Sequence, residues 1–215
     1  MDAKTEIVKT IMQMSGQYST YSIFSDWIEC LAICLSNGTD LVRRREQWLK
    51  REKQFITAMG KYSQEEQLQF AKLTFLLPQA YEEGLTDILG EIYMESESAN
   101  KSTGQFFTPF TVCETVARIR LAEYKGGKIT VFEPTAGSGG MVIAMAKIIQ
   151  EQGENYQKVL EVTTQDLDWK AVYMTYVQLS YLGIRAIVKQ GNALEGGEPK
   201  EEQIFYTPAY KGMLI

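Results

Sequence analysis

The stretch that most constrains this chain is a strand, a glycine turn and a helix in direct succession. Residues 128–132 form a short β-rich run, and residues 141–149 form a strongly apolar helical run. Between them lies the sequence Glu-Pro-Thr-Ala-Gly-Ser-Gly-Gly of residues 133–140. Glycines let the backbone approach a ligand closely, and the following helix presents free N–H groups and a positive dipole end. The stretch therefore predicts the entrance of a nucleotide-type pocket.

The composition of the turn disfavours two common nucleotide ligands. A dinucleotide fingerprint would have a third glycine at position 142, where this chain has Val142, and a P-loop would end in Gly-Lys-Ser/Thr, which is missing. The turn instead suits a ligand with a ribose and a charged amino-acid tail, whose ammonium group Glu133 could receive at the end of the strand. The alternative is a turn that only joins a strand to a helix.

Strands and helices alternate through the second half of the chain, which predicts a parallel, doubly wound α/β sheet. The strand after the glycine turn ends at Asp166, whose carboxylate could accept both hydroxyls of a ribose, while Asp168 is placed to cap the next helix. The following strand ends at Gly191-Asn192, and an Asn amide can read an adenine edge. The alternatives are that both acids are helix caps and that Asn192 is a loop residue. The predicted strands are 129–132, 159–164, 186–190 and 203–206, and the predicted helices are 109–123, 141–150 and 169–182.

Residues 1–95 have helical periodicity and predict a helical domain ahead of the α/β domain of residues 96–215. The run 21–35 is apolar on nearly all sides, so its helix should be central and buried, with Asn37-Gly38 as its end. Ser63 and Glu66 have the spacing of a capping box. A basic cluster at residues 43–53, which includes Arg51, is typical of a solvated helix face or, alternatively, of a ridge that contacts phosphates.

Composition limits the chemistry that this chain can perform. There is no histidine, and the three cysteines include no Cys-x-x-Cys pair, so we expect no metal site and cysteines that pack as small hydrophobic residues in a reducing cytoplasm. No apolar run approaches the roughly 18 residues of a membrane span. The net charge of -5 argues against strong autonomous binding to nucleic acid.

Four short motifs in order carry a resemblance to a known family. They are Gly-Gln-Phe-Phe-Thr-Pro at residues 104–109, Glu-Pro-Thr-Ala-Gly at 133–137, Gln165-Asp166, and Gly191-Asn192. Together they resemble the adenine-specific DNA methyltransferases, and they are most similar to the modification (M) subunit of type I restriction systems. The resemblance implies a Rossmann-like domain that binds S-adenosylmethionine (SAM) behind an N-terminal helical domain.

The same resemblance implies a set of cofactor-binding residues. Residues 105–109 would close over the methionine part of SAM, the turn would line its backbone-facing side, Asp166 would hold the ribose, and Asn192 would sit near the adenine. The implied cofactor-binding residues are Gln105, Phe106, Phe107, Thr108, Pro109, Glu133, Thr135, Ala136, Gly137, Ser138, Gly139, Asp166, Asn192 and Leu194.

The family's catalytic motif, Asn/Asp/Ser-Pro-Pro-Tyr/Phe, has only one candidate counterpart, Thr207-Pro208-Ala209-Tyr210. By the resemblance, Tyr210 would stack on a flipped-out adenine and Thr207 would accept a hydrogen bond from its amino group. The second proline is absent, so the turn that aims the backbone carbonyl is less constrained. The rival interpretation is a Thr-Pro turn in a chain without the activity.

The resemblance implies transfer of a methyl group from SAM to the N6 amino group of adenine in DNA. Only 23 residues follow Asn192, too few for a seven-stranded sheet and a target-recognition region, so we expect a fragment or a protein that works on DNA with a separate specificity subunit or a second protomer. One alternative is a SAM-binding assembly module without catalysis. Another is methylation of an amine in protein or RNA.

Overall fold

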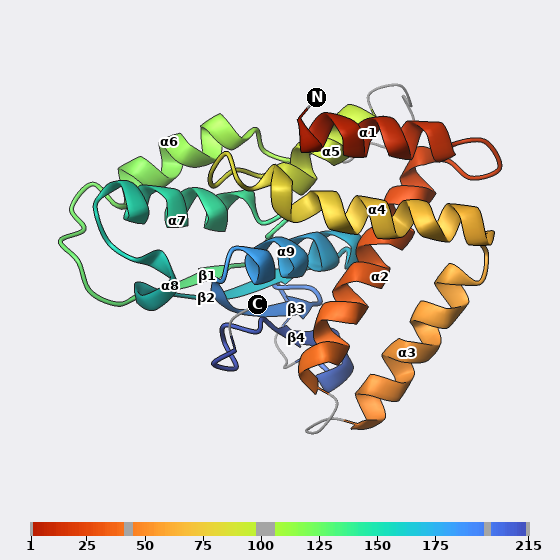
Figure 1. The fold of residues 1–215 in the computed structure, drawn as a ribbon. Helices are drawn as coiled ribbons and strands as arrows, with labels where there is room; N and C mark the ends of the chain where they lie inside the picture. Colours follow the sequence, from red (N-terminus) through yellow and green to blue (C-terminus); the bar gives the residue numbers. More distant parts are fainter. Residues whose placement is uncertain (1, 41–44, 98–105, 196–198, 214–215) are drawn as a thin grey trace. The chain divides into compact units, whose positions relative to one another are not determined.

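The computed structural model describes residues 2–40, 45–97, 106–195 and 199–213, and the chain divides into two compact units (Figure 1). The first unit comprises Met1–Gly84 and Ile88–Phe106, and the second comprises Leu85–Asp87 and Phe107–Ile215. The second unit therefore takes three residues from a stretch of chain that otherwise belongs to the first. That residues 1–95 and 96–215 are separate domains stays a prediction.

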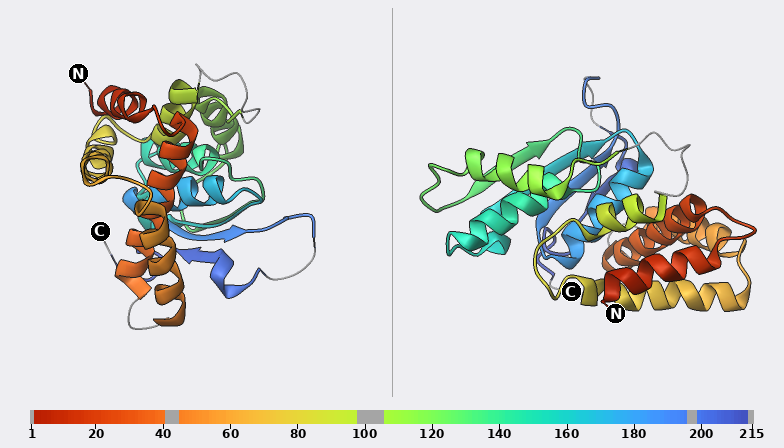
Figure 2. Two further views of the ribbon diagram at one scale, coloured as in Figure 1. Left: turned by 90° about the vertical axis from the view of Figure 1, so that its right-hand side faces the viewer. Right: turned by 90° about the horizontal axis from the view of Figure 1, so that it is seen from above.

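The first unit is helical and is built around α2. Phe24, Trp27 and Ile28 of this helix are almost completely buried, and the indole N–H of Trp27 donates to Thr74 Oγ1 at 3.1 Å. The expectation of a central, buried helix is confirmed. Helices α1 and α4 run side by side in this unit (Figure 2). Its described helices are α1 (Ala3–Met14), α2 (Thr20–Asp40), α3 (Arg45–Met59), α4 (Gln64–Ala80) and α5 (Ile88–Glu97).

Of two helix ends predicted from the sequence in the first unit, the start of α4 is confirmed and the end of α2 is wrong. Ser63 caps α4 with a capping box, in which Glu66 N–H donates to Ser63 Oγ at 3.3 Å and Ser63 N–H donates to Glu66 Oε2 at 2.8 Å. The predicted end of α2 at Asn37-Gly38 is wrong, because the helix continues to Asp40. The Asn37 amide donates to Glu52 Oε2 of α3 at 3.1 Å, so its side chain contacts another helix and does not cap the end of α2.

Arg51 of α3 lies in the interior rather than on a solvated basic face. Its side chain is 5% exposed, and its Nη1 donates to Asp40 Oδ2 of α2 at 3.2 Å and to the Ser36 hydroxyl. The Asp40 side chain is 2% exposed. For this member of the basic cluster, both sequence interpretations are wrong. Arg43 and Arg44 lie outside the described residues.

The second unit is a four-stranded sheet with order β1-β2-β3-β4, and its first three strands are parallel. Helices α7 and α9 connect these strands and lie on the same side of the sheet (Figures 1 and 2), as right-handed crossovers in one direction require. The elements are α6 (Phe110–Arg120), β1 (Ile129–Glu133), α7 (Gly140–Glu151), α8 (Tyr156–Val159), β2 (Leu160–Asp166), α9 (Trp169–Tyr181), β3 (Arg185–Gln190), the 3-10 turn η1 (Glu201–Gln203) and β4 (Ile204–Tyr206).

The core of this unit lies between the sheet and its helices. Val162, Ala186, Val188 and Phe205, which point to one face of the sheet, are buried. Helix α6 packs beside α7, and ion pairs link the two helices, Lys147 with Glu114 at 2.6 Å and Arg118 with Glu151 at 2.7 Å. The Rossmann-like α/β class is therefore confirmed, although the described helices do not cover both faces as a doubly wound sheet would require.

The direction of the last strand differs from the sequence-based expectation. Strand β4 pairs antiparallel with β3, with Ile187 opposite Tyr206 and Lys189 opposite Ile204. The prediction of an all-parallel sheet is therefore wrong for this strand. The residues that follow β4 emerge at the end of the sheet where β3 begins, whereas the residues that follow β1, β2 and β3 emerge at the other end.

Candidate functional site

The glycine turn joins the carboxyl end of β1 to the first residue of α7, and two of its glycines have backbone angles that other residues avoid. Gly137 has a φ of 58° and Gly139 a φ of 97°. A Cβ atom at position 137 would lie 3.2 Å from Phe107 Cδ1, and one at position 139 would lie 3.3 Å from Thr175 Oγ1. Both backbone angle and close packing therefore require glycine at these two positions.

Asp166, at the end of β2, lies directly against the glycine turn. Its Oδ2 accepts the Gly137 N–H at 2.8 Å, and its Oδ1 accepts the N–H of Asp168 at 2.9 Å. The Ala136 N–H donates to the Gln165 carbonyl at 3.0 Å. The carboxyl ends of β1 and β2 are thus joined by hydrogen bonds. A carboxylate has about four acceptor positions, so Asp166 can accept further donors from a ligand.

Glu133, the last residue of β1, is half-buried at the start of the turn. Its Oε1 accepts the backbone N–H of Thr135 at 3.1 Å and the Thr135 hydroxyl at 3.3 Å. These bonds fix the direction of one carboxylate oxygen. Glu133 and Asp166 give this edge of the sheet two acidic groups on neighbouring strands, which is an arrangement suited to a ligand with cationic and hydroxyl groups.

The end of β3 adjoins the end of β2. Gly191 N–H donates to the Asp166 carbonyl at 2.8 Å, which brings Gly191-Asn192 to the same edge of the sheet. The Asn192 side chain is used locally, because its Nδ2 donates to Glu195 Oε1 at 2.9 Å and its Oδ1 accepts the Leu194 N–H at 3.0 Å. Leu194 is 95% exposed.

The aromatic segment ahead of α6 reaches the turn through Phe107, whose ring occupies the space beside Gly137 that a side chain would need. The Thr108 carbonyl accepts a weak hydrogen bond from Cys113 Sγ at 3.8 Å, and Pro109 is the N-cap residue of α6. Phe106 is exposed, and Gln105 lies outside the described residues. The structure thus brings Phe107 to the turn.

Three polar residues that were not expected at the site hold the turn in place by hydrogen bonds. The Thr175 hydroxyl of α9 donates to the Gly137 carbonyl at 3.0 Å, and Gln178 Nε2 donates to the Ser138 carbonyl at 2.7 Å. Asp87 accepts hydrogen bonds from the Ser138 hydroxyl and from Gln178. A sequence signal existed for two of them, since Thr175 and Gln178 are polar residues three apart in a helix whose other side chains are mostly apolar.

The residues chosen as catalytic lie at the other end of the sheet. Thr207 is fully buried, and its N–H donates to the Ala186 carbonyl at 3.0 Å, near the start of β3. Asp166 pairs instead with Gln190 at the end of β3, four residues or about 13 Å along the strand. Because β4 is antiparallel, Thr207, Pro208 and Tyr210 are not brought together with the glycine turn, contrary to expectation.

The Thr207 hydroxyl has a structural role at its observed position. It donates to the Ile184 carbonyl at 2.8 Å and accepts the Ala186 N–H at 2.9 Å. We expect Thr207→Val, which keeps the shape and removes the hydroxyl, to lower the free energy of unfolding by about 1–3 kcal/mol, because two buried backbone groups lose a partner. Urea unfolding would measure this. An unchanged stability would contradict the two hydrogen bonds.

The buried cysteines are not activated as nucleophiles. Burial raises the pKa of the Cys30 thiol to about 12, and burial followed by the neighbouring Asp87 raises the pKa of Cys113, so both thiols stay protonated. Among the described residues no group of three His, Cys, Asp or Glu side chains is placed to hold a metal ion. In the same part of the chain, no helix has the length and apolar character needed to cross a membrane.

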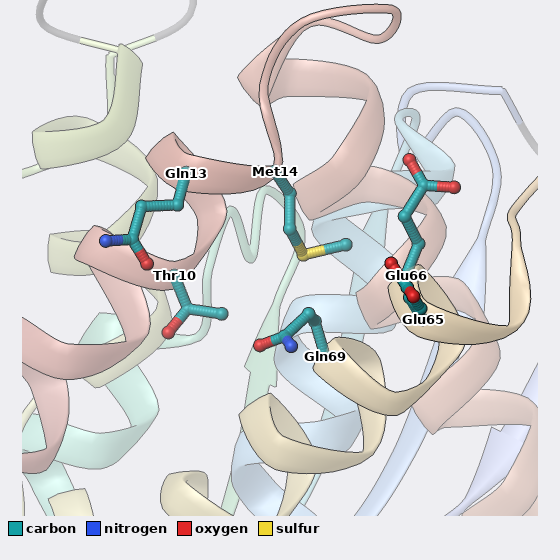
Figure 3. Close-up of a pocket in the computed structure, with 6 residues that line it drawn as sticks. All are labelled: Thr10, Gln13, Met14, Glu65, Glu66 and Gln69. Carbon is teal, nitrogen blue, oxygen red and sulfur yellow. The ribbon is translucent and has the colours of Figure 1, made fainter.

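The first unit has a cleft between α1 and α4, whose lining is shown in Figure 3. Two of its polar side chains already have partners within the unit. Thr10 donates to the Glu6 carbonyl at 2.8 Å, and Glu66 belongs to the capping box of α4. We therefore assign no ligand to it. The lining residues are Thr10, Gln13, Met14, Glu65, Glu66 and Gln69.

Comparison with known proteins identifies a family and solved structures of similar fold. The sequence profile of the N-6 DNA Methylase family matches residues 84–206, more than half of the chain. A Listeria monocytogenes protein described as a class I S-adenosylmethionine-dependent methyltransferase has a similar fold, with a TM-score of 0.52, 12% identity and coverage of 91% of this chain. The methyltransferase subunit of a type I restriction-modification system from Streptococcus thermophilus gives a TM-score of 0.50, 17% identity and 88% coverage. This chain spans 55% and 43% of the length of those two chains.

Proposed function

Because this chain belongs to the N-6 DNA methylase family, we propose that it binds SAM at the turn between β1 and α7 and supplies the cofactor half of a DNA adenine-N6 methyltransferase. The observation that carries the proposal is the hydrogen bond between Asp166 and Gly137, which unites the acidic end of β2 with the glycine turn. The ends of the three parallel strands provide the polar groups. In α/β sheets ligands bind at this edge.

The residues at this edge fit the chemistry of SAM. The cofactor has a ribose, a cationic sulfonium and an amino-acid tail, and when bound it supplies an electrophilic methyl group. Asp166 would accept the ribose hydroxyls, and Glu133 would face the ammonium group. Gly137, which has no side chain, leaves room for the Phe107 ring beside the turn. Asn192 and the exposed Leu194 would lie at the adenine.

We infer that the groups that bind the target adenine of the substrate are supplied from outside the described fold. The acceptor for the adenine amino group should lie at the cofactor edge of the sheet, and Thr207 lies at the opposite end. The chain also spans only 55% and 43% of the two similar structures. A DNA substrate and a specificity subunit or second protomer would complete the enzyme. The similar structure from Streptococcus thermophilus is described as one subunit of a type I restriction-modification system, which supports an enzyme made of several chains.

Replacing Asp166 tests the cofactor site directly. We expect Asp166→Ala to weaken SAM binding roughly 5- to 150-fold, because a charged hydrogen-bond acceptor worth about 1–3 kcal/mol is lost. Isothermal titration with SAM on the folded variant measures the change.

Asp168→Ala is a matched control, since this acid lies two residues away and caps α9, with its Oδ1 accepting the Lys170 N–H at 2.9 Å. Its loss should lower stability by about 1 kcal/mol and leave SAM affinity unchanged. Equal affinity of the Asp166 variant and the wild type would show that the acid was chosen wrongly. A folded wild-type protein that binds no SAM at millimolar concentration would refute the proposed function.

A second candidate function is a SAM-binding assembly module without catalysis. The burial of Thr207 and its distance from the turn favour it, because they remove the one motif in the chain that resembles the family's catalytic residues. Transfer of labelled methyl from SAM to DNA, assayed with and without co-encoded partners, separates the two functions. Transfer that requires a partner and survives Tyr210→Ala supports the first proposal, and transfer in no combination supports the second. Labelling of RNA or protein instead of DNA would change the substrate class.

A further inference from the structure

Asp87 is a buried acid that comes to the second unit from a distant part of the chain. Its side chain is buried, with the residue 3% exposed. The segment Leu85–Asp87 belongs to the second unit, whereas the residues on either side of it belong to the first. Ser138, which Asp87 contacts, lies 51 positions further along the chain. A buried carboxylate costs free energy unless it is hydrogen-bonded, so its partners are the first question.

The partners of Asp87 form a closed ring beneath the glycine turn. The Ser138 hydroxyl donates to its Oδ2, and Gln178 Nε2 donates to its Oδ1 at 2.7 Å. The same Gln178 nitrogen donates to the Ser138 carbonyl at 2.7 Å. Ser138 and Gln178 are as buried as Asp87, at 3% and 0% exposure. Hydrogen bonds in such a dry network are strong and leave few alternative geometries.

Asp87 also lies against the first residue of α7. A Cβ atom at Gly140 would be 2.9 Å from Asp87 Oδ2, so the carboxylate occupies the space that a side chain would take there. A negative group at a helix N-terminus is stabilised by the helix dipole. The carboxylate thus contacts the turn at Ser138 and the helix at Gly140, one residue on each side of Gly139.

The ring acts on the residue that faces the cofactor. Ser138 directly follows Gly137, whose N–H is held by Asp166 and whose carbonyl is held by Thr175. A shift of Ser138 would therefore move Gly137 relative to Asp166. Apolar packing could fill the same space, but it would not fix the Ser138 side-chain rotamer or the rotation of the peptide between Ser138 and Gly139, which the hydrogen bonds to Asp87 and from Gln178 do.

We propose that Asp87 is a positioning residue for the cofactor turn. By holding the Ser138 hydroxyl and Gln178, it sets the orientation of Gly137 against Asp166, and the affinity for SAM depends on it although it does not touch the cofactor. This inference rests on the proposed function. Asp87 is then a determinant of SAM affinity that lies outside β1, the glycine turn and α7.

A double-mutant cycle with SAM as the ligand tests the proposal. Asp87→Ala, Ser138→Ala and the double variant are titrated with SAM calorimetrically, well below their unfolding midpoints. We expect each single variant to bind SAM roughly 2- to 30-fold more weakly, and the double variant to lose clearly less than the product of the two, because both changes break the same contact. Asp87→Asn, which keeps one acceptor oxygen, should recover part of the affinity.

Asp40→Asn is the matched control, because Asp40 is an equally buried acid of the first unit. It should lower the unfolding midpoint and leave SAM affinity unchanged, whereas the Asp87 variants should change both. If Asp87→Ala does not fold, Ser138→Ala and Asp87→Asn supply the same comparison. SAM affinities of the Asp87 and Ser138 variants equal to wild type, with Asp166→Ala still weakened, would overturn this inference and leave the proposed function standing. No SAM binding by the wild type would overturn both.

Discussion

Gly137→Val is expected to weaken SAM binding at least about tenfold and to lower the free energy of unfolding by roughly 2–5 kcal/mol. The two contributions have separate causes. A β-branched residue at a φ of 58° is strained, and its Cβ would lie 3.2 Å from the Phe107 ring, so either the turn or the ring must move. Calorimetric titration with SAM and urea unfolding measure the two effects on the same preparation.

Gly153→Val separates backbone strain from steric conflict at the turn. Gly153 has a φ of 85°, but a Cβ atom there would meet nothing within 4 Å. This variant should lose about 1–3 kcal/mol of stability from strain alone and bind SAM as the wild type does. SAM binding by the Gly137 variant at wild-type affinity would show that the cofactor does not lie against this turn.

Arg51→Ala should have the largest effect on the stability of the first unit. It removes the ion pair with the Asp40 carboxylate, which is 2% exposed, and breaking a buried ion pair of this kind costs about 3–5 kcal/mol. Urea unfolding followed by tryptophan fluorescence reports on it, because Trp27 lies in the core of the same unit.

Arg118→Ala provides the comparison at the surface. Arg118 pairs with Glu151 at 2.7 Å, a shorter distance than that of the buried pair, but the two side chains are 56% and 40% exposed. Solvent screening should reduce its effect to about 0–1 kcal/mol. Comparable losses for the two arginine variants would contradict the burial of Arg51.

The sequence was informative where structure depends on local patterns. The apolar run after Gly140 and the β-rich run before Glu133 predicted the strand, turn and helix that the structure contains, and Ser63 with Glu66 predicted a capping box. These features depend on side-chain periodicity and on hydrogen bonds between residues three apart. Asp166 could be placed beside the turn for a different reason, because parallel strands have their carboxyl ends at one edge of the sheet.

Long-range partners explain what the sequence did not predict. Residues 204–206 have the composition of a strand, but composition carries no direction. The connection from β3 has only 13 residues, and their described part contains only the short turn η1, where a parallel crossover would usually need a helix. Arg51 looked like part of a solvated cluster because its partner, Asp40, belongs to another helix. The ring around Asp87 was missed because its members lie 51 and 40 residues apart.

The three-residue segment Leu85–Asp87 makes the α/β unit discontinuous along the chain. A polypeptide that starts at Phe107 would contain every strand of the sheet and still lack the carboxylate under the turn. The Ser138 hydroxyl and the Gln178 amide would then face a buried void in place of an anion. A fragment that keeps the whole α/β unit must therefore begin at or before Leu85, and as one continuous piece it also carries Ile88–Phe106 of the first unit.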